Sequence, residues 1–228
     1  MFYSVQGEGP TSGTPAYFMR LQGCNLDCGF CDTTEVWKRG ERKTNSELVQ
    51  KLKDDGQLAN ILTGKTHVVW TGGEPALPHH QKGITDFLSY LETEYPGSPV
   101  YNELETNGTL ALIPEMTLRM NQINCSPKLS NSGEPKEKRI VPYVINQIKN
   151  MNSTFKFVVS NESDIDELKD DYVFPFNLFH KQVILMPEVT RLKDLSDRTR
   201  FVYDMAKKYG YRATTRGQVL AWDKTTGV

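Results

Sequence analysis

Short apolar runs alternate with amphipathic segments along nearly the whole chain, and this alternation limits the possible folds more than any other feature of the sequence. Short apolar runs are typical of buried strands, and amphipathic segments are typical of helices. Because parallel neighbouring strands need a crossover connection, a strand–helix succession predicts a parallel sheet. We expect strands at residues 16–21, 67–70, 100–104, 122–125, 154–159, 182–186 and 218–222.

The segments between these strands predict helices. T-N-S-E, residues 44–47, has the form of a capping box, so a helix is expected to begin near Thr44. Six or seven strand–helix units predict a partial (β/α)6-type barrel in one α/β domain spanning residues 1–228. Residues 129–139 form the longest expected loop, rich in Gly, Pro, Ser and charge, and are expected to be solvent-exposed. The other expected helices are 82–94, 137–150, 164–170 and 196–209.

Composition excludes some classes of function. The 27 basic and 28 acidic side chains nearly cancel, so no long-range field is expected to attract nucleic acid or a membrane surface. No charged-then-apolar leader opens the sequence, and no apolar run approaches the roughly 20 residues that span a bilayer. We therefore expect a cytoplasmic protein without direct nucleic-acid or membrane contacts.

Three of the four cysteines, Cys24, Cys28 and Cys31, lie in a C-x3-C-x2-C loop. Such a loop can wrap three of the four irons of a cuboidal iron-sulfur cluster and leave the fourth iron open to a ligand. Alternatively, the loop binds zinc with a fourth ligand such as Cys125 or a histidine, or its thiols are unrelated. Cys125 by itself is expected to be a small buried side chain.

The order of the motifs resembles that of the radical S-adenosylmethionine (SAM) superfamily. T-G-G-E-P (71–75), E-T-N-G (105–108) and S-P-K (126–128) follow successive expected strands after the cysteine loop. The resemblance implies a [4Fe-4S] cluster on Cys24, Cys28 and Cys31, with SAM on the open iron. Met186 stands where many members carry glutamine, so a backbone contact is expected there. The implied SAM-binding residues are Phe30, Cys31, Asp32, Gly72, Gly73, Asn107, Ser126, Pro127, Lys128 and Met186.

The beginning of the sequence narrows the resemblance. Residues 2–33 contain Q-G-E-G, an arginine in the first parallel strand, N-L-x-C inside the loop and C-D-T at its end. This combination is similar to the opening of the 7-carboxy-7-deazaguanine synthase family, and the tail Q-V-L-A-W-D-K-T-T-G-V is similar to that family's tail. The resemblance implies a carbon–nitrogen lyase of 7-deazapurine (queuosine-type) biosynthesis. It would convert 6-carboxy-5,6,7,8-tetrahydropterin to 7-carboxy-7-deazaguanine with loss of ammonia.

The same resemblance implies where the pterin binds. An N-terminal segment, residues 1–15, and a C-terminal tail, residues 216–228, would flank the cluster loop, residues 24–31. Carboxylate, amide and backbone groups can pair with the pterin edge, and a guanidinium can grip its carboxylate in two places. The implied substrate-binding residues are Val5, Gln6, Gly7, Glu8, Arg20, Thr71 and Val228.

Thr33 is the implied ligand of a magnesium ion that also contacts the substrate. A hydroxyl, waters and substrate oxygens suit this hard ion. The competing interpretation is that Asp32 and Thr33 only cap the next segment.

Two other functions are compatible with parts of the sequence. A radical SAM activase that makes a glycyl radical on a partner protein shares the cysteine spacing, but its sequences lack Q-G-E-G and C-D-T. A zinc-binding interaction module would leave T-G-G-E-P and E-T-N-G unexplained. For a deazaguanine synthase, the resemblance further implies a flavodoxin-type electron donor and a homodimer.

Overall fold

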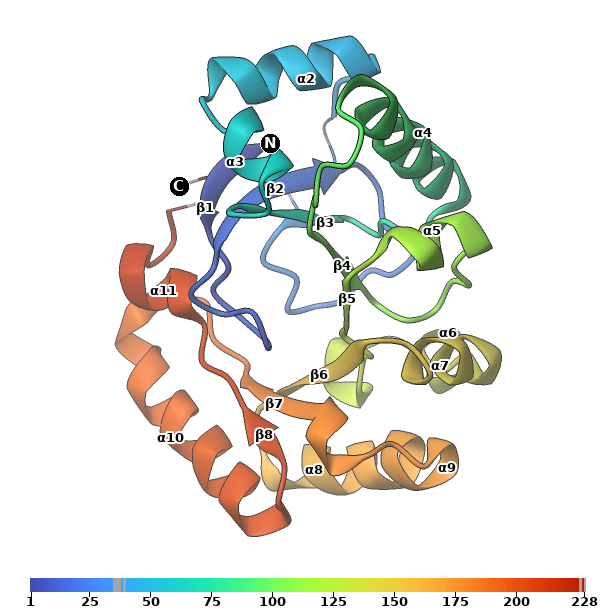
Figure 1. Ribbon diagram of the computed structural model, residues 1–228. Coiled ribbons are helices and arrows are strands. Elements are labelled where there is room, and N and C mark those ends of the chain that lie inside the picture. Colours follow the sequence, from blue (N-terminus) through green and yellow to red (C-terminus); the bar gives the residue numbers. More distant parts are fainter. Residues whose placement is uncertain (35–37, 39, 226, 228) are drawn as a thin grey trace.

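One eight-stranded sheet organises the protein, whose computed structural model describes residues 1–34, 38, 40–225 and 227. The strands lie side by side in chain order. β1 runs antiparallel to β2, and each later strand runs parallel to the one before it (Figure 1). The expected α/β class with a mostly parallel sheet is confirmed. The strands are β1 (Phe2–Val5), β2 (Pro15–Leu21), β3 (His67–Gly72), β4 (Asn102–Thr106), β5 (Gln122–Cys125), β6 (Ser153–Val159), β7 (Val183–Pro187) and β8 (Arg212–Ala213).

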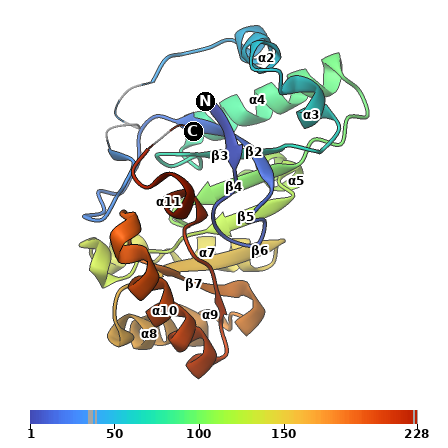
Figure 2. The same ribbon diagram turned by 90° about the vertical axis from the view of Figure 1, so that its left-hand side faces the viewer.

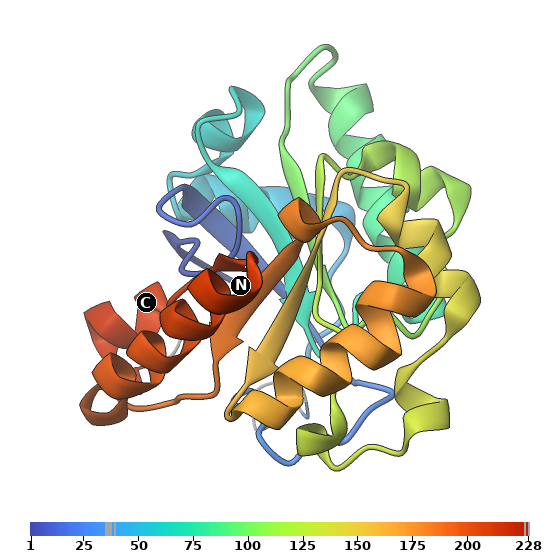
Figure 3. The ribbon, with the colours of Figure 1, turned by 90° about the horizontal axis from the view of Figure 1, so that it is seen from below.

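Helices surround the outer side of this open, curved sheet (Figures 1 and 3). α2 begins with the expected capping box, in which Thr44 and Glu47 each accept a hydrogen bond from the other's backbone N–H. No helix in the described part of the chain is long and apolar enough to cross a bilayer. The helices are α2 (Asn45–Asp54), α3 (Leu58–Leu62), α4 (Pro78–Glu94), α5 (Pro114–Arg119), α6 (Lys136–Arg139), α7 (Pro142–Lys149), α8 (Glu162–Leu168), α9 (Phe174–Phe176), α10 (Leu192–Tyr209) and α11 (Gly217–Trp222), with short turns η1 (Ser130–Ser132), η2 (Lys169–Val173) and η3 (His180–Gln182).

The two faces of the sheet differ in polarity. Outward-facing side chains such as Trp70, Leu104 and Phe157 belong to the apolar core between the sheet and the helices. Because side chains alternate along a strand, their neighbours face inward. Glu105 and Lys156 are inward-facing neighbours of this kind, and both line a cavity on the concave side. The apolar core therefore lies between the convex face of the sheet and the helices. The concave face is available for polar chemistry.

Two expected elements are wrong. Residues 218–222 form most of helix α11 instead of a strand, because a short apolar run fits either structure. The expected helix 137–150 is split into α6 and α7 at Pro142, which has no N–H to donate and disfavours helical backbone at Val141. The strands β1 and β8 were not expected from the sequence. α11 packs beside the N-terminal hairpin (Figure 2), where Gly217 N–H donates to Gly7 O.

Candidate active site

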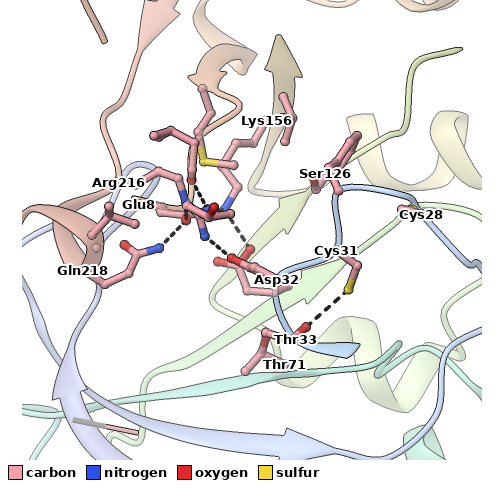
Figure 4. A pocket seen from close by; sticks show the side chains of 18 of the residues that line it. Glu8, Cys28, Cys31, Asp32, Thr33, Thr71, Ser126, Lys156, Arg216 and Gln218 are labelled. Atoms are coloured by element: carbon pink, nitrogen blue, oxygen red, sulfur yellow. Dashed lines mark hydrogen bonds and ion pairs between the residues drawn. The ribbon is translucent and has the colours of Figure 1, made fainter. Parts of the chain in front are cut away.

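A cavity of about 1030 Å³ opens at the carboxyl ends of the parallel strands. It brings together almost every residue that the sequence analysis singled out. The three loop cysteines, Thr33 and the described substrate-binding candidates line it, as do the SAM-binding candidates except Pro127, which is buried. Val228 lies outside the described residues. Figure 4 shows the cluster-loop residues facing a group of charged side chains across this space.

The cysteine loop lies between β2 and α2, with all three thiols half-buried. Cys31 N–H donates to Cys28 O at 3.1 Å, and Cys31 Sγ lies 3.6 Å from Thr33 Oγ1. In the described residues, no group of three or more His, Cys, Asp or Glu side chains is arranged to hold one metal ion. The loop suits a cuboidal cluster, in which each thiolate binds a different iron and the sulfurs need not meet at one point.

Most of segment 129–139 is exposed, as its composition predicts, but two of its residues support the cysteine loop. Gly29 N–H donates to Ser132 O at 2.9 Å, and Asp27 N–H donates to the Glu134 carboxylate. Ser132 and Glu134 are both buried. Composition predicts exposure only on average, and here these polar groups are buried because each has a partner in the cysteine loop.

Further along the same segment, Arg139 is 4% exposed and pairs with Glu167 at 2.6 Å. It also donates to Lys128 O at 3.2 Å, and the Tyr172 hydroxyl donates to the same oxygen at 2.7 Å. These contacts fix the backbone of the S-P-K motif, whose Lys128 ammonium donates to Ser126 Oγ at 2.9 Å.

The two glycines of T-G-G-E-P allow the end of β3 to touch the cysteine loop. Gly73 N–H donates to Leu21 O at 2.9 Å, and Glu74 N–H donates to Gly23 O at 2.8 Å. A Cβ at Gly73 would lie 1.6 Å from Gly23 O, so no larger residue fits without moving backbone. The backbone N–H groups of Gly73 and Glu74 are therefore engaged within the protein.

Glu74 joins β3 to β4 inside the protein. Its carboxylate accepts hydrogen bonds from the Asn107 N–H and the Thr106 hydroxyl, both at 2.7 Å. Burial raises the pKa of Glu74, although these hydrogen bonds act in the opposite direction. The Asn107 side chain in turn donates to Asn25 in the cysteine loop at 2.9 Å, so the amide expected to bind SAM also holds the loop.

Glu8 is the centre of the charged group opposite the cysteines. Its Oε2 accepts from Lys156 at 2.7 Å, and its Oε1 accepts from Arg216 at 2.9 Å and from Gln218 at 2.6 Å (Figure 4). Burial alone would raise the pKa of Glu8, but Lys156 and Arg216 outweigh it and lower that pKa. Glu8 is therefore an ionised hydrogen-bond acceptor at neutral pH.

Lys156 connects Glu8 to a second carboxylate, Glu105, whose side chain is 18% exposed. Its ammonium also donates to Glu105 at 3.1 Å, and its side chain is 4% exposed. Burial alone would lower the pKa of Lys156, but Glu105 and Glu8 outweigh it and raise that pKa. Asn124 donates to Glu105 at 3.0 Å and Gln6 donates to it at 3.3 Å. A polar network thus continues from Glu8 into the interior of the sheet.

Arg20 is a further partly desolvated cation in the cavity. It lies beside Thr71 in the β2–β3 register, and its guanidinium lies 5.3 Å from the ring centroid of Phe2. Burial lowers the pKa of Arg20, partly offset by Asp32. Arg20 stays charged, because an arginine pKa lies far above neutrality.

Lys156, Arg216 and Gln218 were missed by the sequence reasoning. For Lys156 a signal exists, because a lysine in the middle of the apolar run F-K-F-V-V must be buried if the run is a central strand. Arg216 precedes a short apolar run and carries no comparable signal.

Comparison with known proteins agrees with this arrangement. Residues 20–128 match the Radical SAM superfamily. A 7-carboxy-7-deazaguanine synthase of Pyrobaculum aerophilum is 33% identical over 100% of this chain and 95% of its own length. Enzymes of the same name from Aquifex aeolicus and Halobacterium salinarum are 34% and 30% identical, over 91% and 98% of this chain and 84% and 89% of their own lengths.

A solved structure, native anSMEcpe with bound AdoMet, shares the fold with a TM-score of 0.57 at 16% identity, over 93% of this chain and 68% of that one. The full-length sequence matches establish a closer relationship than the fold does. This chain therefore belongs to the 7-carboxy-7-deazaguanine synthase family, within the radical SAM superfamily.

Proposed function

We propose that this protein converts 6-carboxy-5,6,7,8-tetrahydropterin to 7-carboxy-7-deazaguanine with loss of ammonia, in 7-deazapurine biosynthesis. The observation that carries the proposal is the placement of the three-cysteine loop and the Glu8 group around one cavity. The cysteine loop supplies ligands for a redox cofactor. The Glu8 group supplies hydrogen-bond acceptors and cations for a polar heterocycle that bears a carboxylate.

Cys24, Cys28 and Cys31 would hold a [4Fe-4S] cluster, and the backbones of Gly72 and Gly73 would help to hold SAM. When bound, this pair supplies a strongly oxidising carbon radical that removes one hydrogen atom from the substrate. The donor set fits, because three half-buried thiols share the cavity with the close backbone contact at Gly73. We assign the remaining SAM contacts to the cavity-lining candidates named above.

The substrate side would recognise N–H donors and a carboxylate. Glu8 accepts three protein hydrogen bonds, so about one of its four lone-pair positions is left for a ligand. Gln218 Oε1 is buried and has no partner among the described residues, so it is a second free acceptor. These two acceptors suit the amide and amine of a pterin edge, and Arg20 suits its carboxylate. This protein's residues would orient the pterin and exclude water.

Incubation of the reduced, cluster-loaded protein with SAM, magnesium and the carboxytetrahydropterin tests the proposal. We expect 7-carboxy-7-deazaguanine, detected by mass spectrometry, and release of ammonium. Formation of 5'-deoxyadenosine without the deazaguanine would reject the substrate and leave a glycyl-radical activase as the alternative. A colourless protein that holds stoichiometric zinc would reject the radical chemistry altogether.

We propose Thr33 as the magnesium ligand, since its hydroxyl lines the cavity beside Cys31. Thr33→Ala is expected to leave SAM binding intact and to lower turnover roughly 10- to 100-fold, because the oxygen ligand of a hard cation is lost. Turnover should be measured against magnesium concentration.

Thr34→Ala is the matched control. The Thr34 hydroxyl donates to Cys31 O at 3.2 Å and does not line the cavity. The control should keep the wild-type magnesium dependence. An unchanged magnesium response in Thr33→Ala would support the capping role instead.

We also propose that residues 1–228 act as one catalytic unit, in which segment 1–15 and the tail from residue 216 meet at the cavity. The hydrogen bond from Gly217 N–H to Gly7 O, at 2.9 Å, supports this. A flavodoxin-type donor, a homodimer and a cytoplasmic location are further proposals, supported by the family resemblance.

A further inference from the structure

Arg216 connects three segments that are far apart in the sequence. Its Nε donates to Glu8 at 2.9 Å, its Nη1 donates to Val189 O at 2.5 Å and its Nη2 donates to the Asp32 carboxylate. Figure 4 shows the guanidinium between the Glu8 and Asp32 side chains. The Arg216 and Glu8 side chains are 12% and 13% exposed, so the hydrogen bond between them is largely shielded from water, whereas Asp32 is 40% exposed.

The hydrogen bond from Arg216 to Asp32 matters for function because of where Asp32 lies in the sequence. It lies between Cys31, the last cysteine of the loop, and Thr33. A hydrogen bond to Asp32 therefore restrains the short peptide that carries both side chains. Glu8, on the other side of Arg216, belongs to the substrate side of the cavity. One side chain thus joins the cofactor side of the cavity to its substrate side.

Charge and shape both favour arginine at this position. Glu8 and Asp32 carry like charges on the same cavity, and a cation between them turns their repulsion into attraction. A guanidinium is planar and presents its N–H groups in a fixed fork, so it sets both separation and direction. A lysine ammonium is a single point charge, which cannot reproduce three divergent hydrogen bonds.

We propose that Arg216 is a positioning residue that holds the Cys31–Thr33 segment at a fixed place relative to Glu8, and so aligns the bound substrate with the radical source. The inference rests on the proposed function. Hydrogen transfer requires reacting atoms about 3–3.5 Å apart, and a misplacement of about 1 Å can lower the rate about 100-fold. Arg216 acts through Glu8 and Asp32, without touching the reacting atoms.

The first test compares Arg216→Lys and Arg216→Gln with the wild type, in cluster-loaded protein with SAM, magnesium and substrate. Deazaguanine formation should fall roughly 10- to 100-fold, and 5'-deoxyadenosine release should change less than about threefold. The ratio of 5'-deoxyadenosine to deazaguanine should therefore rise at least about threefold, and Arg216→Lys should show this rise as Arg216→Gln does. Arg212→Lys is the control, since Arg212 is exposed and donates to Lys181 O outside the cavity.

A second measurement needs neither cofactor nor substrate. Asp32→Asn should lower the midpoint of thermal unfolding in the wild type and have a much smaller effect in Arg216→Gln, because the pair is already broken. Glu8→Gln should show a weaker dependence on Arg216, because Lys156 still pairs with Glu8 when Arg216 is replaced.

The outcomes separate the inference from the proposed function. A wild type that makes no deazaguanine would reject the function, while the unfolding cycle would still report the coupling of Arg216 to Asp32 and Glu8. A functional wild type whose Arg216 variants keep the normal product ratio would overturn the inference. So would an equal fall of both products with loss of the cluster, which would show support of the fold alone.

Discussion

Gly73→Ala is expected to prevent stable assembly of the iron-sulfur cluster although all three cysteines remain. The added Cβ would lie 1.6 Å from Gly23 O, and that carbonyl belongs to the residue before Cys24. The overlap can be relieved only by backbone movement of the loop or of the end of β3. We expect turnover to fall at least about 100-fold, because even a displacement of about 1 Å has that effect. Iron and sulfide per chain after anaerobic reconstitution are the measurement.

Two reference variants define the low and the normal iron content in this experiment. Cys28→Ala defines the iron content of a chain that lacks a cluster ligand. Gly83→Ala adds the same methyl group inside α4, where a Cβ would meet nothing within 4 Å. The latter should keep the cluster and stabilise the protein by about 0.5–1 kcal/mol. Normal iron content in Gly73→Ala would show that the loop tolerates movement at this contact.

Lys156→Met is expected to lower the free energy of unfolding at neutral pH by about 3–5 kcal/mol, because it leaves Glu105, which is 18% exposed, without its cation. Glu8 also loses a partner but keeps Arg216. Denaturant unfolding at a series of pH values is the measurement. Lys207→Met is the control, since Lys207 is exposed and pairs with Asp204 at 3.4 Å on the surface. The control should change stability by less than about 1 kcal/mol.

The pH dependence distinguishes a lost charge from lost packing. Burial already raises the pKa of Glu105, and loss of Lys156 should raise it further. A carboxyl group whose pKa is raised by folding favours the folded state below its unfolded pKa, and this contribution is lost as the pH rises through the folded pKa. The loss of unfolding free energy in Lys156→Met should therefore be largest above neutrality. It should shrink as the pH falls toward the pKa of glutamate in the unfolded chain. A deficit independent of pH would indicate that packing alone was lost.

The sequence predicted the scaffold better than the contacts across the cavity. The parallel strands and the order of their terminal motifs could be read because apolar runs and glycine-rich ends have local signatures. The run at residues 218–222 has no such distinction, and the helix α11 forms there beside Gly7. Packing against the N-terminal segment decided that these residues form a helix and not a strand, and local sequence does not encode that packing.

The charged residues show a different limit. Glu134 is buried because it accepts a hydrogen bond from Asp27 in the cysteine loop, and Arg139 is buried because it pairs with Glu167. Both partners lie far away in the sequence. Likewise, Lys156 and Arg216 gain their roles only when folding places them beside Glu8. A single sequence identifies residue types, whereas a pairing across the sheet needs the register of strands and loops.

The contacts around Glu8 also have a consequence for the order of folding. Glu8 pairs with Arg216 and Gln218 across sequence separations of 208 and 210 residues. Closing so long a loop has an entropic cost that must be met before the contact contributes, and contacts of this kind form late. The sheet and its outer helices can consolidate while the cavity is still open. Local opening of the two end segments then becomes a route to an inactive molecule that retains its core, so the fraction of competent enzyme can fall without global unfolding.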